Sequence, residues 1–402
     1  MAGLSSFLAL VVGVALWLVL RDESYVAPPP TAPAQRVQPA PAAALLQELT
    51  KAVRDADEEA AADLASASNA AAQEQLRTLV TNAEQIGLHD VSLRYLDELG
   101  GIDPAGEWPA TATLTWRFDS FDTGLATTEV QVDFAASGNS VGIAGLDGVS
   151  LESAATPIWF ADPVQVRRTP ETLVVAAQRA DDYSLLARRA VPVVRRVLPD
   201  WPGGLVVEVP ASAADLDAAL GAEPGTFGNV AGVTATVDGT GSRGAPVHVF
   251  LNPARIRELR PAGAQVVVSH EAAHVALDAT SSALPVWLSE GFADYVALRD
   301  VPLPLRTTAG QIIRQVRREG PPRTLPGDAD FDEESEYFGA AYEASWLACR
   351  LLAERVGEDE LLRFYRQADG SDDFAGLFRR TFELGEQEFT ERWRTALSDL
   401  AG

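Results

Sequence analysis

Two histidines and a glutamate stand at a spacing that suits zinc chemistry. His270, Glu271 and His274 form the pattern His-Glu-x-x-His. On a helix, positions i and i+4 lie on one face, one turn apart, so both imidazoles can reach one Zn²⁺ at about 2.0–2.1 Å. Glu271 follows the first histidine and can take a proton from a water that the metal activates. The pattern predicts a catalytic zinc site with Glu271 as general base.

A catalytic zinc site needs three protein ligands and one open position. The segment WLSEGFADY follows His274 and predicts a second helix that begins at Glu290, with Asp294 one turn later on the same face. We expect Glu290 to be the third ligand. We expect Asp294 to accept a hydrogen bond from the ring N–H of His270, which would set the tautomer of that ligand. His248 is an alternative third ligand, although packing within a strand explains it better.

The pattern His-Glu-x-x-His followed by Trp-Leu-x-Glu-Gly-x-Ala-x-Tyr resembles the gluzincin metallopeptidases. The short spacing is similar to their compact, peptidase-MA-like members. This resemblance covers residues 178–402 and implies a mostly helical, zincin-like domain that uses Zn²⁺ to hydrolyse a peptide or protein. It also implies that the strand Val247–Leu251 is the sheet edge to which the substrate main chain adds.

The resemblance also supplies a candidate for oxyanion stabilisation. In the related aminopeptidases, a tyrosine in a Tyr-Glu-Lys-Gly segment has this role, and the matching segment here is Tyr342-Glu343-Ala344-Ser345. Tyr342 is therefore the second expected catalytic residue, and Tyr337 is its substitute. The sequence has no Gly-x-Met-Glu-Asn segment, with which the aminopeptidases hold a free amine. The resemblance therefore implies a peptidase that is not an aminopeptidase.

The elements that must position these residues can be read from the periodicity. Pro261 suits the first turn of a helix, and Ala264 to Leu277 contain no glycine or proline, so the active helix is well defined. Before it, the sequence predicts a helix (YSLLARRAVPVVRRVL), a strand at 205–209, a short helix at 211–220 and the strands VAGVTATVD and PVHVFLNP. Helices follow it almost to the C-terminus.

The region 43–177 predicts a separate α+β domain. Apolar residues follow helical spacing from 43 to about 100, and the period then changes to two. The expected strands are TATLTWRF, TTEVQVDFA, SVGIAGL, TPIWFA, VQVRR and TLVVAA. Helices followed by a curled antiparallel sheet resemble the cystatin-like fold. The fold class expected for the whole chain is thus α+β.

The N-terminus predicts a membrane segment and a spacer. Residues 4–20 are nearly all apolar, which favours a transmembrane signal-anchor over 1–20; a cleaved signal peptide is the alternative. Residues 21–42 form a linker whose prolines favour polyproline II. The anchor and the signal peptide both place the rest of the chain outside the cytoplasm, as a single-pass protein of the cell membrane or as a secreted protein; a core helix of a soluble protein, the remaining alternative for residues 4–20, does not.

Composition excludes several classes of function. The chain has 402 residues and a formal net charge of −25, and a surface so acidic repels phosphate backbones, which argues against nucleic-acid binding. A single cysteine, Cys349, excludes an intramolecular disulfide and a cysteine-based zinc cluster. We expect it to be a buried free thiol. The composition leaves the oligomeric state open.

Three functions are therefore weighed. The first is a zinc peptidase whose metal ligands are His270, His274 and Glu290. The second is a metal-binding domain without turnover, and the position of Glu271 argues against it because a purely structural site does not need that carboxylate. The third is an extracytoplasmic scaffolding module formed by 43–177.

Overall fold

Alternating apolar residues between 88 and 147 form a four-stranded antiparallel sheet. The computed structural model describes residues 36–402 except 68, 139, 148–153, 243 and 333–334. The strand order is β1-β2-β3-β4, a meander in which each strand pairs with the next. The strands are β1 (Leu88–Glu98), β2 (Glu107–Phe118), β3 (Ala126–Ser137) and β4 (Ser140–Asp147).

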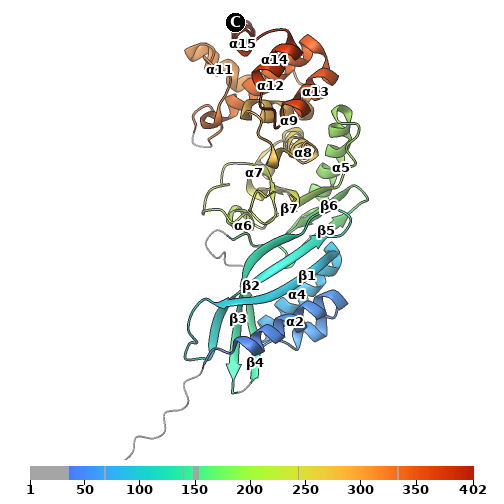
Figure 1. The fold of residues 1–402 in the computed structure, drawn as a ribbon, viewed down its shortest axis with the longest axis vertical. Helices are drawn as coiled ribbons and strands as arrows, with labels where there is room; N and C mark the ends of the chain where they lie inside the picture. Colours follow the sequence, from blue (N-terminus) through green and yellow to red (C-terminus); the bar gives the residue numbers. More distant parts are fainter. Residues whose placement is uncertain (1–35, 68, 139, 148–153, 243, 333–334) are drawn as a thin grey trace, which may run out of the picture. The chain divides into compact units, whose positions relative to one another are not determined.

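Among the described residues, three helices precede this sheet. They are α2 (Pro39–Asp55), α3 (Glu58–Ala62) and α4 (Ala70–Ile86), of which α2 contacts β1 and α4 contacts β4. Figure 1 shows α2 and α4 beside the meander. Trp108 and Trp116 of β2 are buried in the shared core because every second side chain of the strand points to that face. Helices followed by an antiparallel sheet agree with the α+β organisation expected here.

A second sheet of five strands contains both parallel and antiparallel pairs. Its order is β5-β6-β7-β9-β8; β6, β7 and β9 are parallel, whereas β5 and β8 run antiparallel at the two edges. The strands are β5 (Gln165–Arg168), β6 (Thr172–Ala176), β7 (Leu205–Val209), β8 (Gly232–Thr236) and β9 (Val247–Leu251).

The central strands of this sheet are covered on both faces. In β6, Val174 belongs to the core that includes the helices α5 (Ala180–Val197) and α8 (Pro261–Ala276), and Val175 belongs to the core shared with the meander. Burial on both faces explains why β6 and β7 are nearly continuous apolar runs. The exception in β7 is Glu208, which is 3% exposed.

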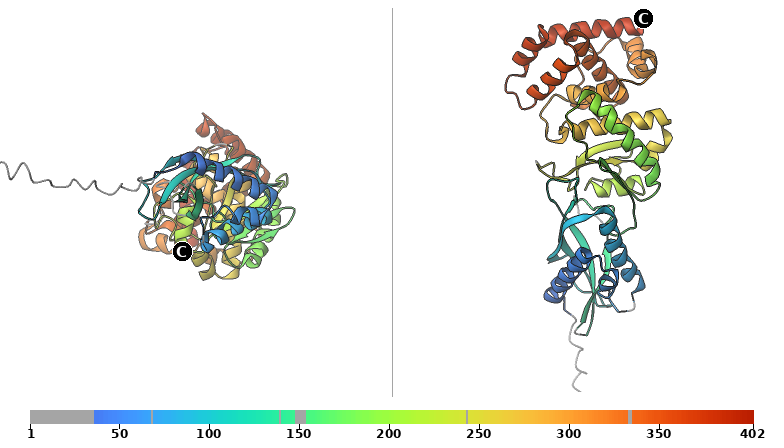
Figure 2. Two further views of the ribbon diagram at one scale, coloured as in Figure 1. Left: turned by 90° about the horizontal axis from the view of Figure 1, so that it is seen from below. Right: turned by 90° about the vertical axis from the view of Figure 1, so that its right-hand side faces the viewer.

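The helices after residue 177 form the rest of the chain, and those after α9 lie together (orange to red in Figure 2). They are α5 (Ala180–Val197), α6 (Ala213–Ala219), α7 (Pro253–Glu258), α8 (Pro261–Ala276), α9 (Val286–Leu298), α10 (Leu305–Thr308), α11 (Gly310–Glu319), α12 (Phe338–Val356), α13 (Glu358–Ala368), α14 (Phe374–Phe382) and α15 (Glu386–Ala401), with 3₁₀ turns η1 (Ala279–Ser281) and η2 (Asp328–Phe331).

Several sequence expectations about the N-terminal half were wrong. The helical run does not continue to residue 100: Gly87, in the left-handed region, ends α4, and β1 follows. Two irregularities in the pairing of β1 with β2 interrupt the alternation that would have revealed the strand. The linker also ends early, because α2 begins at Pro39. Proline is tolerated there because the first turn of a helix does not use its backbone N–H groups.

The segment 156–161 and the position of the sheet boundary also differ from expectation. TPIWFA is a buried turn rather than a strand: Trp159 and Phe160 are buried, and the carbonyl of Trp159 accepts a hydrogen bond from the side chain of Asn82. β5 pairs with β6 and β6 pairs with β7, so the change from the first to the second sheet falls before residue 165 rather than at 177.

In the part of the chain that the structure describes, no helix has both the length and the apolar character needed to cross a bilayer. The expected anchor at 1–20 lies outside the described residues, as does most of the expected linker.

Candidate metal centre

Helix α8 brings the two histidines and the glutamate of the motif together. Pro261 occupies its first position, as expected, and the helix contacts α5, α9, β8 and β9. His270, Glu271 and His274 are each less than 9% exposed. Such burial of polar side chains is costly without partners, so the contacts of these three residues determine what the site can hold.

Two imidazole nitrogens and one carboxylate oxygen converge on one point. Nε2 of His270 lies 2.9 Å from Nε2 of His274, and Oε2 of Glu290 lies 3.2 and 3.3 Å from these two nitrogens. Tetrahedral ligands about 2.0–2.1 Å from a zinc ion are roughly 3.3 Å apart. The three donor atoms are therefore close enough to bind one Zn²⁺, and their types are those that zinc accepts.

Asp294 lies where the sequence predicted it. Its Oδ1 is 2.8 Å from Nδ1 of His270. A carboxylate accepts hydrogen bonds, so this contact requires a proton on Nδ1. In the neutral ring, Nε2 then carries the lone pair, and this nitrogen faces His274 and Glu290. Asp294 thus selects the tautomer of His270 that can bind a metal.

Both carboxylates come from α9, which begins earlier than expected. The helix starts at Val286, so Glu290 lies in its second turn and does not begin it. The next residue, Gly291, faces α12: a Cβ atom there would lie 2.3 Å from the backbone oxygen of Ser345. Only glycine permits this approach of α9 to α12, which places Glu290 opposite α8.

The charges of the site also fit a bound cation. Burial alone would lower the pKa of His270, but Asp294 and Glu290 outweigh it and hold that pKa well above its ordinary range. Burial would raise the pKa of Glu290, but His274 and His270 hold it well below its ordinary range. The site therefore favours positive charge between these side chains, which a proton or a metal ion can supply.

We expect the replacement Asp294→Ala to lower zinc affinity by about 10- to 100-fold, the usual effect of removing a carboxylate that orients a histidine ligand. The three donor atoms remain in this variant, but His270 loses the partner that sets its tautomer. Titration with a competing chelator measures the affinity. Asp300→Ala, an exposed residue that follows the C-terminus of α9, is the control and should bind zinc as the wild type does. Equal affinity in all three proteins would contradict the role of Asp294.

A cavity of about 220 Å³ adjoins the three donor atoms. Its described lining residues all come from 227–342, so none belongs to the N-terminal α+β region. They are Phe227, Val230, Gly232, Val233, Thr234, His270, Glu271, His274, Ala279, Thr280, Ser289, Glu290 and Tyr342. Apolar and polar side chains thus share a space beside the candidate metal site.

The strand at the sheet edge beside the cavity is β8, whereas the sequence predicted β9. β9 pairs with β7 on one side and β8 on the other, so its main chain is already used. Gly232, Val233 and Thr234 of β8 line the cavity, and the hydroxyl of Thr234 donates to Oε2 of Glu271 over 2.7 Å. Thr234 was not predicted as a site residue, because it lies 37 positions before Glu271 and no local pattern links the two.

Tyr342 lies at the cavity, as expected for a group that could act there. Its ring centroid is 6.0 Å from that of His270, and the rings of Phe331 and Phe338 pack edge-on against it at 5.0 and 5.2 Å. Its substitute, Tyr337, does not line the cavity; the hydroxyl of Tyr337 contacts Arg318 and Glu319. Of these two tyrosines, only Tyr342 lies beside the histidines.

His248 does not reach the three donor atoms. Its Nδ1 lies 2.6 Å from Oε1 of Glu208 and its Nε2 lies 2.9 Å from Oδ1 of Asp122. Because both nitrogens face carboxylates, both carry protons. The expectation of strand packing was therefore incomplete, since this ring is the centre of a buried ionic triad that links the meander to the second sheet.

Two other features show no comparable chemistry. Cys349 is buried as expected, and burial raises the pKa of its thiol, so it is not a reactive nucleophile.

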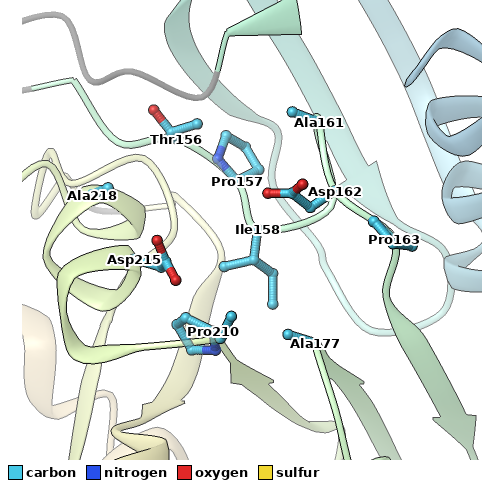
Figure 3. A pocket seen from close by; sticks show the side chains of 11 residues that line it. Thr156, Pro157, Ile158, Ala161, Asp162, Pro163, Ala177, Pro210, Asp215 and Ala218 are labelled. Atoms are coloured by element: carbon cyan, nitrogen blue, oxygen red, sulfur yellow. The ribbon is translucent and has the colours of Figure 1, made fainter. Parts of the chain in front are cut away.

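A second cavity lies near the ends of β6 and β7 (Figure 3). The residues that line it include prolines, alanines and the carboxylates of Asp162 and Asp215. None of the described residues that line it is a histidine or a cysteine.

Comparison with known proteins adds no relative. No family model, curated protein or solved structure matches this chain. The family resemblance stated above therefore rests on the residues of this chain alone, and so does any function assigned to the site.

Proposed function

We propose that this protein is a zinc-dependent peptidase that hydrolyses internal peptide bonds of a peptide or protein substrate. One observation carries the proposal: Nε2 of His270, Nε2 of His274 and Oε2 of Glu290 lie within 3.3 Å of one another. Beside them, Glu271 lines the cavity and is not needed as a ligand. A purely structural metal site requires the three converging donor atoms but does not require a further carboxylate, such as that of Glu271, beside them.

His270, His274 and Glu290 would hold the ion. When bound, Zn²⁺ supplies a Lewis acid that polarises a carbonyl group and makes water acidic enough to lose a proton near neutral pH. Glu271 accepts the proton of the attacking water and then gives it to the leaving amine. The hydroxyl of Tyr342 donates a hydrogen bond to the carbonyl oxygen as charge develops on it. Asp294 keeps His270 in the tautomer that binds metal.

The substrate main chain would add to the edge of β8. An extended peptide that pairs with this strand runs beside Gly232 and Thr234 and so passes the cavity next to Glu271. Main-chain pairing is independent of side-chain identity and suits a polypeptide. A membrane-anchored or secreted location, with residues 1–20 as the anchor or signal, remains part of the proposal.

The test measures metal content and cleavage together in the purified full-length protein. We expect about one zinc ion per chain, cleavage of a mixed peptide library, and loss of cleavage on adding a chelator with recovery on adding Zn²⁺. His270→Ala should bind little zinc and cleave nothing. A wild-type protein that binds no more zinc than His270→Ala would disprove the proposal.

The same test distinguishes the peptidase from two other functions. Zinc in the wild type without cleavage of any peptide would indicate a metal-binding domain that lacks turnover. Neither zinc nor cleavage would leave the scaffolding function of 43–177. Only the joint presence of zinc and chelator-sensitive cleavage supports the peptidase.

A further inference from the structure

We propose that Thr234 is a positioning residue for Glu271, and that the edge strand β8 therefore both holds the general base and receives the substrate. The inference rests on the proposed function, because it assigns Glu271 a proton-transfer role. It differs from that function in placing part of the catalytic arrangement on β8, outside the His-Glu-x-x-His motif.

The direct evidence is a short hydrogen bond. Oγ1 of Thr234 lies 2.7 Å from Oε2 of Glu271 and 3.1 Å from the backbone oxygen of the same residue. The hydroxyl has one proton, and the shorter contact goes to the carboxylate. A hydrogen bond to a charged acceptor is among the stronger ones in proteins. It leaves Oε1 of Glu271 as the oxygen that takes the proton from water.

A second observation shows how closely β8 approaches this side chain. Gly232 has no side chain, and a Cβ atom there would lie 3.1 Å from Cγ of Glu271. It would also lie 3.1 Å from Leu251 and 3.2 Å from Val267, so three neighbours would have to shift together. The main chain of β8 thus forms one wall of the space that Glu271 occupies, and Thr234 supplies the polar contact.

Strand geometry explains why these two residues act together. Side chains alternate along a strand, so positions 232 and 234 face the same side. Pairing with β9 sets this register, with Gly232 opposite Leu251 and Thr234 opposite Val249. A shift of one residue would turn Val233 toward Glu271 instead. The register of β8 therefore determines which side chain meets the general base.

This arrangement places the base and the substrate on one element. A peptide added to the edge of β8 is positioned relative to the backbone of Thr234, and the hydroxyl of Thr234 positions the carboxylate. Small errors in the distance between reacting groups cost large factors in rate. Because β8 holds both the general base and the substrate, the distance between them varies less. Loss of the Thr234 hydroxyl should therefore lower kcat rather than raise KM.

The test compares Thr234→Val, Thr234→Ser and a matched control, Thr236→Val, in the zinc-loaded full-length protein. Valine removes the hydroxyl but keeps the shape, and serine keeps the hydroxyl. Thr236 is on the same strand, but its hydroxyl accepts a hydrogen bond from the backbone N–H of Gly241. We expect Thr234→Val to retain zinc and KM but to lose about 10- to 100-fold in kcat, the usual worth of a hydrogen bond to a charged group. Thr234→Ser should recover most of this loss.

Crystal structures of the zinc-loaded proteins provide a readout that does not depend on activity. The carboxylate of Glu271 should keep its place in the wild type and in Thr234→Ser, and move in Thr234→Val. An unmoved carboxylate with unchanged kcat in Thr234→Val would overturn the inference, as would an equal loss of kcat in Thr236→Val. If the wild type cleaves no peptide, the proposed function fails, and the position of Glu271 in the crystals alone decides the positioning role.

Discussion

Glu271→Gln is expected to abolish peptide cleavage while leaving zinc in the site. Glutamine has nearly the same shape as glutamate but does not accept and return a proton, and general-base catalysis is worth about 10²–10⁴ in rate. The side chain is not one of the three that converge as ligands, so metal content should stay near one ion per chain. Metal analysis and kcat/KM for a cleaved peptide measure the two effects.

The matched control is Glu290→Gln, the same chemical change on the neighbouring helix. This variant should lose zinc as well as activity, because Oε2 of Glu290 is one of the donor atoms. Equal metal loss in both variants would mean that Glu271 is itself a ligand. Cleavage that survives Glu271→Gln would mean that another group accepts the proton, and the mechanism proposed for this residue would then be wrong.

His248→Gln is expected to destabilise the folded protein by about 3–5 kcal/mol, the usual cost of removing one partner from a buried ionic group. Asp122, Glu208 and His248 are each at most 4% exposed in their side chains. Without the imidazolium, two carboxylates remain buried near each other with no cation between them. Denaturant unfolding near neutral pH measures the change, and zinc content should be unaffected because the triad is separate from the metal site.

The stability of the wild type should also depend on pH. Burial opposes the charge of His248, but Asp122 and Glu208 outweigh it and raise its pKa to about 9 from an ordinary value of 6.5. A raised histidine pKa stabilises the fold fully below about pH 6.5, and this contribution is lost as the pH rises through about 9. The loss amounts to about 3 kcal/mol at 1.36 kcal/mol per pKa unit.

A comparison of stability against pH in two proteins distinguishes the loss of the His248 proton from general alkaline denaturation. The zinc-saturated wild type should lose stability between pH 6.5 and 9, whereas His248→Gln should be less stable at the lower pH and change little over the same interval. Parallel pH curves for the two proteins would show that His248 carries no excess proton in the folded state.

The local part of the site could be predicted from the sequence because a helix repeats its geometry. The spacing of His270 and His274 places them on one face of α8, and the spacing of Glu290 and Asp294 does the same on α9. Both relations depend on residues one turn apart, whose separation is nearly the same in every α-helix. The contact between Asp294 and His270 joins the two helices; it was expected because a histidine ligand commonly donates its other ring N–H to a carboxylate, and it is present.

Relations that depend on strand order could not be predicted in this way. β9 (VHVFL) is more apolar than β8 (GVTAT), but composition alone does not state which strands pair with each of them and so which one lies at the sheet edge. Thr234 and Glu271, or His248 and Asp122, are distant in sequence and meet only because particular strands pair and pack. β1 was missed for a related reason, since its irregular pairing with β2 interrupts the alternation.

Residue types and local spacing establish the chemistry available to this protein: two imidazoles and a nearby glutamate on one helix, a pair of carboxylates on the next, an acidic composition and a single thiol. The folded arrangement sets which strand lies beside the general base and which histidine lies buried between two carboxylates outside the metal site. The physical reason is that helical spacing is a property of the chain next to each residue, whereas strand order and burial arise from contacts between segments far apart in the chain.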